Sequence, residues 1–495
     1  MKNLFIILFF LPLFASAKKI TLKPQSWGAA YNGVNMQYSP GDTLVILATD
    51  NWAKIGLYIE NVHGTKAKPV VIINEGGQTK LGAIALHSCT HIKLTGAGGG
   101  DFYGFLSDGA FSAIDVTGRS SHIEIERWKV LNAGYICRAK QDPHCDPQFN
   151  YPNWRMDNIS IHDTWSSKIN QDGMYFGNTA PTSGRPIGCN GETISPIPMR
   201  LSNVSIYNNY IESTGRTAIQ ISGADSGVNR IYNNTIRRTG FELNQTQGSG
   251  IIVGGMAHAD VYNNHIRETF QFGILVMGSG FSRVYNNNID SSGMLDGVSN
   301  PGYRISIACN AVYTYPLTTS RIEIKNNKVG SIDIYNIVTG KAADTWETGN
   351  VICGNYLQNG KAAVIQNNGN INYTTNCGGV LPVTWGEISY GNDVLLFNTL
   401  TETNNKLFEV EESRDGGINY AVIATIPAKG AGKYTTTLSV DYKLTEPKQN
   451  LLCKWFGWGC KPAVNTRINS RKVYRVKQVD IDGRYSYSKT ITIVR

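Results

Sequence analysis

The stretch Ser205-Ile-Tyr-Asn-Asn-Tyr-Ile211 decides the fold, because closely similar stretches follow it along the chain. The further copies are Arg230-Ile-Tyr-Asn-Asn-Thr-Ile236, Asp260-Val-Tyr-Asn-Asn-His-Ile266 and Arg283-Val-Tyr-Asn-Asn-Asn-Ile289. Successive copies begin 25, 30 and 23 residues apart. A repeat of this length indicates structural units that stack on one another.

A second series of short strands alternates with the first. It comprises Gly173-Met-Tyr-Phe-Gly177, Ala218-Ile-Gln-Ile-Ser222, Gly250-Ile-Ile-Val-Gly254 and Gly273-Ile-Leu-Val-Met277. Two short strands per repeat cannot bury an apolar face alone, but stacked coils can, with each strand parallel to its equivalent in the next coil. The alternation predicts that Met174/Phe176 and their equivalents point inward. It also predicts that Tyr175, Gln220, Ile252 and Leu275 point outward.

The paired asparagines suit such a stack. Asparagine tolerates a left-handed turn, and amide side chains stacked coil upon coil can bond along the axis. We predict a structural ladder at the first asparagine of each pair: Asn208, Asn233, Asn263 and Asn286.

The two repeated patterns together resemble the right-handed, single-stranded parallel β-helix of the pectin-lyase-like superfamily, with its PbH1 repeats. The resemblance is clear from Ile123 to Val329 and extends from Ile20 to Asn376. It implies an all-β fold and a β-helix domain over residues 18–380. That superfamily includes polysaccharide lyases, polygalacturonases, uronan epimerases and tail-spike adhesins, so the resemblance specifies fold better than chemistry.

After residue 382 the pattern changes to longer alternating strands. The blocks Leu407-Phe-Glu-Val-Glu-Glu-Ser-Arg-Asp-Gly416 and Tyr474-Arg-Val-Lys-Gln-Val-Asp-Ile-Asp-Gly483 resemble the fibronectin-III-like β-sandwich of exported Bacteroidetes proteins. We therefore expect a small β-sandwich over 383–495. The sorting domain that often follows in that group is not found before Arg495, which puts sorting to the outer surface in doubt.

The first seventeen residues have the features of a secretory signal peptide. Lys2 precedes an apolar run, and Ala15-Ser16-Ala17 offers a cleavage site. We expect cleavage near Ala17, no transmembrane segment, and a secreted, cell-surface or periplasmic monomer. A net charge of +9 with only 17% charged residues, and no basic run with interleaved aromatics, argues against a nucleic-acid partner.

Export permits disulfides among the nine cysteines. Spacing favours Cys137–Cys145 and Cys453–Cys460, and Cys353–Cys377 is a further candidate. The odd number leaves one thiol free or paired between chains.

The irregular loops 134–154, 166–172, 178–200 and 240–249 are long enough to wall a binding groove. Cleavage of a uronate polymer by elimination needs a cation to neutralise the carboxylate, a base and an acid. Lys168 and Arg216 each precede a strand of the second series and are the favoured catalytic pair. The alternative is that both are solvated turn cations.

Hydrolysis would instead need paired carboxylates. Asp172 and Asp225 are the candidates, although the sequence places them at opposite strand ends. The same carboxylates, with Glu242, could bind Ca²⁺, so calcium stays an open cofactor and no metal site is assigned. Residues that could contact a sugar are Tyr175, Gln220, Asp225, Gln247 and His258.

The sequence therefore favours a secreted polysaccharide lyase that cleaves uronate-containing glycans by β-elimination. Two alternatives stay open: a non-catalytic carbohydrate-binding or adhesion protein, and a glycoside hydrolase or epimerase on the same fold.

Overall fold

The computed structural model divides into two compact units, residues 1–375 and 376–495. In the first unit it describes residues 17–25, 29–178, 184–244, 247–277, 280–309, 320–330, 336–340, 346–368 and 371–375. In the second it describes 377, 383–391, 393–401, 405–414, 417, 419–430, 432–438, 442–445, 464–467, 471–480 and 485–494. The predicted signal peptide lies almost entirely outside the described residues. Among those described, no helix has the length and apolar character that crossing a membrane requires.

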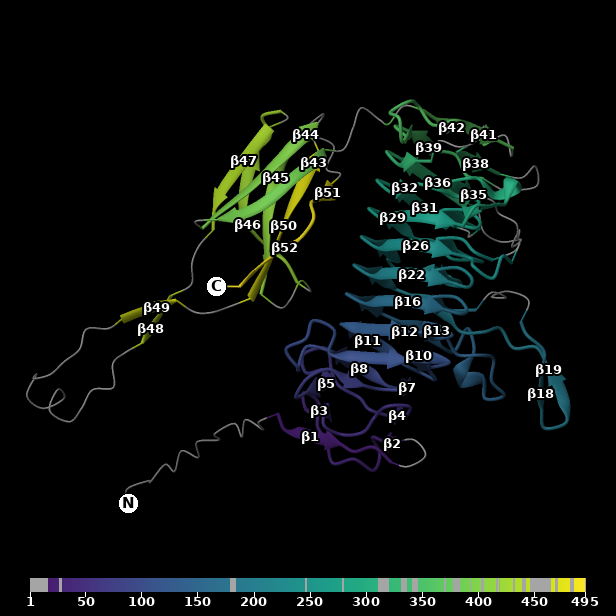
Figure 1. Cartoon of the computed structure of the whole chain (residues 1–495), viewed down its shortest axis with the longest axis vertical. Helices are drawn as coiled ribbons and strands as arrows, with labels where there is room; N and C mark the ends of the chain where they lie inside the picture. Colours follow the sequence, from purple (N-terminus) through teal and green to yellow (C-terminus); the bar gives the residue numbers. More distant parts are fainter. Residues whose placement is uncertain are drawn as a thin grey trace, which may run out of the picture. The chain divides into compact units, whose positions relative to one another are not determined.

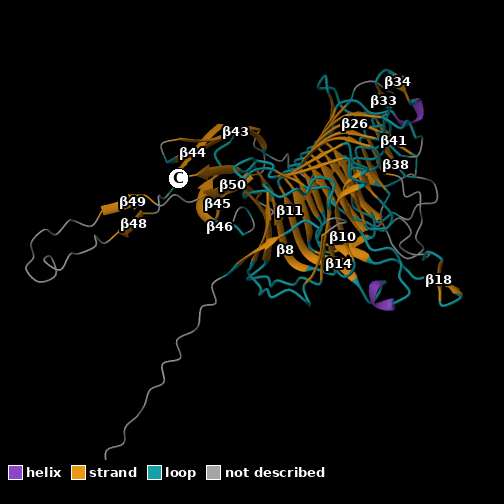
Figure 2. Ribbon diagram, turned by 60° about the horizontal axis from the view of Figure 1, so that its bottom comes forward, coloured by secondary structure: helices purple, strands orange, loops and turns teal. Residues whose placement is uncertain are grey.

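The first unit is a stack of coils whose strands form three long parallel sheets (Figures 1 and 2). Sheet A contains β1 (Lys19–Leu22), β3 (Thr43–Leu47), β5 (Val70–Glu75), β8 (Thr90–Thr95), β11 (Ser121–Glu126), β15 (Ile159–His162), β21 (Ser205–Tyr207), β25 (Arg230–Tyr232), β28 (Asp260–Tyr262), β31 (Gly280–Tyr285), β36 (Ser320–Lys325), β39 (Asn350–Cys353) and β42 (Tyr373–Thr374). Sheet B contains β2 (Ala29–Asn32), β4 (Gly56–Glu60), β7 (Ala83–His87), β10 (Ser112–Thr117), β13 (Tyr135–Ala139), β17 (Met174–Phe176), β23 (Ile219–Ile221), β27 (Ile251–Val253), β30 (Ile274–Val276), β35 (Ile307–Cys309), β38 (Ile337–Thr339) and β41 (Ile365–Asn367).

Sheet C completes each coil between sheets A and B. It contains β6 (Thr79–Lys80), β9 (Phe105–Asp108), β12 (Trp128–Leu131), β16 (Trp165–Ile169), β22 (Tyr210–Thr214), β26 (Thr235–Thr239), β29 (His265–Thr269), β32 (Asn288–Ile289), β37 (Lys328–Val329) and β40 (Tyr356–Leu357). A short sheet D, of β14 (Arg155–Asp157), β20 (Arg200–Ser202) and β24 (Ala224–Ser226), lies in the connections that lead from sheet B to sheet A. Parallel pairing from coil to coil is the arrangement that the repeats predict.

The repeated Ile-Tyr-Asn-Asn pattern has one structural task per position. The first apolar residue is fully buried in the core, as at Ile206 and Ile231. The tyrosines face outward on sheet A and stack ring on ring with centroids 4.8–4.9 Å apart: Tyr207, Tyr232, Tyr262 and Tyr285. The first asparagine turns the chain from sheet A to sheet C with a positive φ, 55° at Asn208.

The second asparagine forms the ladder, so our assignment of the ladder to Asn208, Asn233, Asn263 and Asn286 is wrong by one position. Side-chain amide bonds of 2.9–3.0 Å link successive coils through Asn209, Asn234, Asn264, Asn287, Asn327 and Asn355. The reason is geometric, because a left-handed residue directs its side chain outward and the next residue then points into the stack. Asparagine tolerates the first role and suits the second.

The second series of strands has the predicted orientation. Met174, Phe176 and their equivalents in the next coils are buried in one continuous core. The residues between them face outward, but their character changes along sheet B. Ile252, Leu275 and Ala308 form a separate small apolar cluster, whereas the preceding coils place polar side chains on this face.

Long connections carry smaller elements. The hairpin of β18 (Ile187–Cys189) and β19 (Glu192–Ile194) extends away from the stack in Figure 1, and a second hairpin joins β33 (Met294–Leu295) to β34 (Val298–Ser299). Short 3-10 turns span Pro147–Phe149 and Pro301–Tyr303.

The predicted Cys137–Cys145 bridge is wrong. Cys145 pairs with Cys189 instead, which links the connection after β13 to the first hairpin. Cys137 is a buried free thiol because its side chain points inward from sheet B, away from the loop. Cys353 and Cys377 are both disulfide-bonded, and the proposed Cys453–Cys460 pair lies outside the described residues.

The second unit consists of antiparallel sheets. One contains β43 (Thr384–Gly391), β44 (Val394–Thr401) and β47 (Gly432–Thr437). Another contains β45 (Asn405–Ser413), β46 (Ala421–Pro427), β50 (Arg471–Asp480), β51 (Tyr485–Tyr487) and β52 (Ile491–Val494), and β48 (Tyr442–Thr445) pairs with β49 (Val464–Arg467). Its own core includes Phe397, Phe408 and Tyr474. The antiparallel sheets agree with a β-sandwich, and the fibronectin-III-like assignment stays a prediction.

Candidate functional site

The outer face of sheet B carries a row of polar side chains, one from each of four successive coils. The parallel register pairs Asp115 with Arg138, Arg138 with Tyr175, and Tyr175 with Gln220. In every one of these strands the flanking residues are buried in the core, so these four side chains face outward. Tyr175 and Gln220 therefore share the surface on which we expected sugar contacts.

Charges and rings are interleaved along this row. Arg138 donates two hydrogen bonds to Asp115, at 2.7 and 2.9 Å, and its guanidinium also lies over the rings of Phe111 and Tyr135. The bond to Asp115 is the main reason why the pKa of Arg138 is raised. The ammonium of Lys140 lies 5.0 Å from the centre of the Tyr175 ring. The surface thus offers fixed cations beside aromatic faces.

One edge of sheet B, where the chain arrives from sheet C, holds a group that we call the edge cluster: Tyr135, Asp172, Arg216 and Glu242. Arg216 pairs with Glu242 at 3.0 Å, and the backbone N–H of Thr217 donates to Asp172 at 3.1 Å. Backbone bonds connect the turns that carry these residues, from Arg216 to the carbonyl of Gln171 and from Glu242 to that of Gly215. Stacked turns therefore bring together residues far apart in sequence.

The edge cluster contains a carboxyl group with an unusual pKa. Asp172 is 5% exposed, and burial raises its pKa from 3.8 to about 6. The Thr217 amide and Arg216 oppose this rise, while Glu242 adds to it. Burial and the charge of Asp172 also raise the pKa of Tyr135.

Arg216 stays a cation in this setting. Burial is the largest single effect and opposes its charge, but the hydrogen bond to Glu242 and the negative charges of Glu242 and Asp172 together outweigh burial and raise the pKa of Arg216. A group that titrates near neutral pH beside a fixed cation and a neutral phenol is typical of acid–base chemistry.

Lys168 does not share this position, so its predicted equivalence to Arg216 is wrong. It lies in β16 of sheet C, where Ser167 pairs with Glu212 and Ile169 with Thr214. Its equivalent in the next coil is therefore Ser213, and both have a left-handed backbone, with φ values of 58° and 56°. The chain bends there before it reaches sheet B, which leaves the Lys168 side chain exposed on the sheet C side.

Asp225 and His258 belong to a different part of the surface. Asp225, in β24, pairs with Arg155 and Arg200, and both Asp225 and His258 line a cavity of about 660 Å³. This cavity lies between sheet D and the outer face of sheet A. Asp172 and Asp225 therefore stand on different sides of the coil and do not form a catalytic carboxylate pair.

Gln247 lies in the connection from sheet C to sheet B rather than in a groove. Its side-chain oxygen is buried and accepts no hydrogen bond from the described residues. Its assignment as a sugar contact stays a prediction.

Sequence reasoning did not identify Tyr135, Arg138 and Asp115 as site residues, and it considered Glu242 only as a calcium ligand. The sequence alone did not reveal which residues of successive sheet B strands lie side by side. Arg138 and Asp115 are one coil apart at the position of Tyr175, but the connection between β13 and β15 hides that equivalence from a search for even spacing.

Comparison with solved structures finds distant likenesses. The enzymatically active domain of tailspike protein 2 of bacteriophage CBA120 is 10% identical with a TM-score of 0.33, over 91% of this chain and 72% of that one. A mannuronic acid specific polysaccharide family 6 lyase from human gut microbiota is 13% identical with a TM-score of 0.27, over 71% and 82%. A mutant of the periplasmic alginate epimerase AlgG is 11% identical with a TM-score of 0.25, over 72% and 85%.

No protein-family model matches the chain, and neither does any curated protein. At such low identities the structural likenesses concern the fold alone. By its own sheet topology, the chain is a right-handed parallel β-helix protein with antiparallel sheets in its C-terminal unit.

Proposed function

We propose that this protein is an exported enzyme that acts on a polysaccharide bound along the outer face of sheet B. The observation that carries the proposal is the edge cluster, in which the titratable carboxyl of Asp172 lies beside the cation Arg216. The adjoining row of Arg138, Tyr175 and Gln220 offers the ionic, stacking and hydrogen-bonding contacts that an acidic sugar needs. The Cys145–Cys189 bridge fits an oxidising compartment.

The favoured reaction is β-elimination on a uronate-containing chain. Arg216 and Arg138 neutralise the substrate carboxylate, which acidifies the neighbouring C–H bond. Ionised Asp172 removes that proton, a carbon–carbon double bond forms, and the bond to the leaving sugar oxygen breaks. Tyr135, whose raised pKa keeps it protonated, supplies the proton to that oxygen.

A glycoside hydrolase is the second candidate, and one observation favours it. Asp172 and Glu242 both contact Arg216 electrostatically, and the charge of Glu242 adds to the raised pKa of Asp172. A carboxyl group with a raised pKa near a second carboxylate is typical of glycosidases. In this reading protonated Asp172 is the acid and Glu242 is the base or nucleophile, in place of the Asp172–Asp225 pair.

The first experiment incubates the purified mature chain with pectate, alginate, glycosaminoglycan and neutral glycans. Each incubation runs with and without Ca²⁺, because the oxygen atoms of Asp172 and Glu242 are of the kind that calcium prefers. A rise in ultraviolet absorbance from an unsaturated uronate supports elimination, and new reducing ends without that rise support hydrolysis. Binding to a glycan with neither signal would overturn both proposals in favour of the non-catalytic binding protein.

Variants of the edge cluster then test the assigned roles. We expect Asp172→Asn and Arg216→Ala to lower kcat/KM by about 10²–10⁴-fold. Arg237→Ala is the matched control, because Arg237 forms a similar ion pair with Glu268 on sheet C, at 3.3 Å, away from the proposed groove. Equal activity of all three variants would contradict the assignment.

A further inference from the structure

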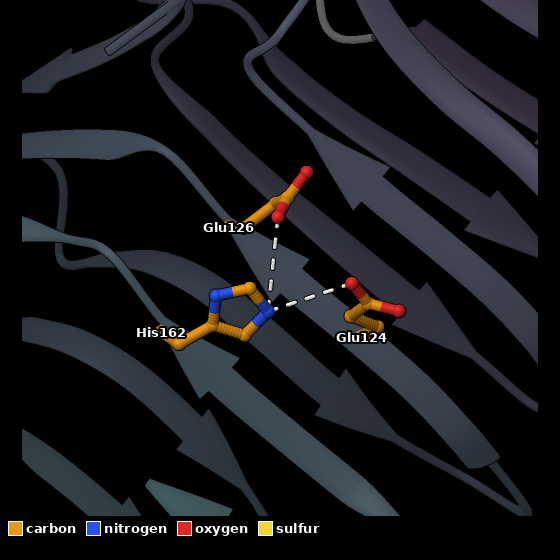
Figure 3. Close-up of side chains that lie close together, drawn as sticks. All are labelled: Glu124, Glu126 and His162. Atoms are coloured by element: carbon orange, nitrogen blue, oxygen red, sulfur yellow. Dashed lines mark ion pairs between the residues drawn. The ribbon is translucent and has the colours of Figure 1, made fainter. Parts of the chain in front are cut away.

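Three side chains on the outer face of sheet A point toward one another (Figure 3). Glu124 and Glu126 extend from β11, and His162 extends from β15, where it pairs in register with Glu126. Their ligand-type atoms all lie within 4.8 Å of one another. The group belongs to a different sheet from the edge cluster and has no part in the proposed reaction.

His162 is held so that one nitrogen faces the two carboxylates. The residue is 5% exposed, and its ring stacks on Tyr207. Its Nδ1 bonds to Asp163 at 2.8 Å, whereas Nε2 is buried and has no hydrogen-bond partner among the described residues. Nε2 lies 3.4 Å from Glu124 and 3.8 Å from Glu126, beyond the length of an ordinary hydrogen bond.

These separations suit a metal ion better than a hydrogen bond. Zinc–ligand bonds of about 2.0–2.1 Å in a tetrahedral site place two ligand atoms about 3.3–3.4 Å apart. The Nε2–Glu124 distance already has this value, and the Nε2–Glu126 distance exceeds it slightly. One imidazole and two carboxylates, with a fourth position for water, is a ligand set that zinc accepts.

The surroundings resemble the second layer of a metal site. Asp163 on Nδ1 directs Nε2 toward the carboxylates, as in carboxylate–histidine–metal triads. The Thr95 hydroxyl donates to Glu126 Oε1 at 2.6 Å, which orients this carboxylate while Oε2 faces the ring. Fixed ligands of this kind lower the cost of binding an ion.

The charge balance also favours a divalent cation. The carboxylates of Glu124 and Glu126 contact Lys93, whose Nζ lies 2.6 Å from Glu124 and 3.3 Å from Glu126, and the carboxylate of Asp163 contacts His162. With His162 neutral, the group has two excess negative charges, which one divalent ion would neutralise. Lys93 occupies part of the same space and is the competitor that the ion must overcome.

We propose that Glu124, Glu126 and His162 form a binding site for a divalent transition metal such as Zn²⁺, which joins β11 to β15. The nitrogen ligand and the small number of oxygen ligands distinguish it from a calcium site. An imidazole binds a metal ion only in its neutral form.

The test uses the full mature chain without an affinity tag, stripped of metal and titrated with Zn²⁺ by calorimetry at about pH 8. We expect one equivalent to bind and to raise the melting temperature. Co²⁺ in place of Zn²⁺ should give visible absorption bands typical of a four-coordinate site. The proposal would be overturned if the wild-type chain bound no stoichiometric Zn²⁺. Nε2 would then hold only a proton.

Variants identify the site. His162→Phe keeps the stacking on Tyr207 and removes the ligand, and Glu126→Gln keeps a carbonyl acceptor for Thr95, so each should weaken binding by more than about 100-fold. Exposed His265→Ala on sheet C is the matched control and should bind as the parent does. Lys93→Met removes the competing ammonium and should tighten binding.

Asp163→Asn tests the positioning of the imidazole. It leaves all three ligands in place and should weaken Zn²⁺ binding by about 10–100-fold. Circular dichroism checks that each variant is folded. Unchanged affinity in folded His162→Phe, or loss of binding in His265→Ala, would contradict the assignment.

Discussion

At the scale of single residues, Asp172 has opposite effects on stability and on the proposed chemistry. Its pKa of about 6 in the folded chain, against a usual 3.8, means that the folded state binds the proton more tightly than the unfolded state. The resulting cost is absent below about pH 4 and complete above about pH 6, where it amounts to about 3 kcal/mol. Stability from this group is therefore lost as the pH rises through that window.

We expect Asp172→Asn to raise the free energy of unfolding by up to about 3 kcal/mol at about pH 7, and to leave it unchanged near pH 4. Asparagine can still accept the Thr217 N–H, so the hydrogen bond is kept. Urea unfolding at the two pH values measures the difference. The exposed Asp296→Asn serves as control, with a change within about 0.5 kcal/mol, and an Asp172→Asn chain that is less stable at both pH values would contradict the argument.

The pH dependence of turnover separates the two proposed reactions. As the base of an elimination, Asp172 must be ionised, so kcat/KM should fall as the pH drops through about 6. As the acid of a hydrolase it must be protonated, so kcat/KM should fall as the pH rises through the same value. Measurement of kcat/KM from about pH 4 to 9 shows whether the rate falls on the acid or on the alkaline side of pH 6. A rate that does not change through pH 6 would exclude Asp172 from both roles.

Single residues also show where sequence reasoning fails. The paired asparagines were recognised, but the choice between Asn208 and Asn209 depends on which residue adopts the positive φ, and a sequence pattern does not encode that. Lys168 and Arg216 are paired in the sequence analysis because each precedes a strand of the second series. Lys168 is itself the left-handed residue of β16, equivalent to Ser213 in β22, so it lies on sheet C before the chain reaches the turn that carries Asp172.

At the scale of elements, the asparagine ladder makes a sharp prediction. The Asn264 side chain takes part in four hydrogen bonds, to the N–H and amide of Asn234, to the carbonyl of Ile231 and to Asn287. Each is worth about 1 kcal/mol and its buried partners would be left unpaired. We therefore expect Asn264→Ala to lower the free energy of unfolding by about 4 kcal/mol, measured by urea denaturation.

The neighbouring Asn263 supplies the matched control. It has a φ of 54°, which glycine adopts without strain, so Asn263→Gly should change stability by less than about 1 kcal/mol. If the two variants were equally destabilised, the separate roles of the two asparagines would be refuted.

Strands and turns differ in how well the sequence predicts them. Alternation alone predicts which residues point inward in β17, β23, β27 and β30. Successive side chains of a strand point to opposite faces, and the apolar set must face the core. The residues of the edge cluster, by contrast, lie in turns, and alternation does not predict how turns stack. Arg216 and Glu242 are 26 residues apart and meet only because their turns stack, so their contact required the coil-to-coil register and the lengths of the intervening connections.

At the scale of the whole molecule, the described residues form two large, separate cores, apart from the small apolar cluster on sheet B. One runs through the coils from Leu22 to Ile352, and the other lies around Phe397, Phe408 and Tyr474. The sequence indicated this division by the change from short repeats to longer alternating strands after residue 382. It could not indicate where on the β-helix a site lies, since all three sheets have the same repeat.

Two cores without a common residue should unfold separately. We expect differential scanning calorimetry of the mature chain to show two transitions, and a chain that ends at residue 382, which keeps Cys377, to lose one of them and retain the other. The retained transition belongs to the β-helix, so this shorter chain should also keep full turnover on any glycan that the full chain cleaves, because Asp172, Arg216 and the polar row all lie in the first unit. A single transition in the full chain, together with an unfolded shorter chain, would show that the coils need the C-terminal sheets to cover their end, as terminal repeats of stacked folds often require a cap.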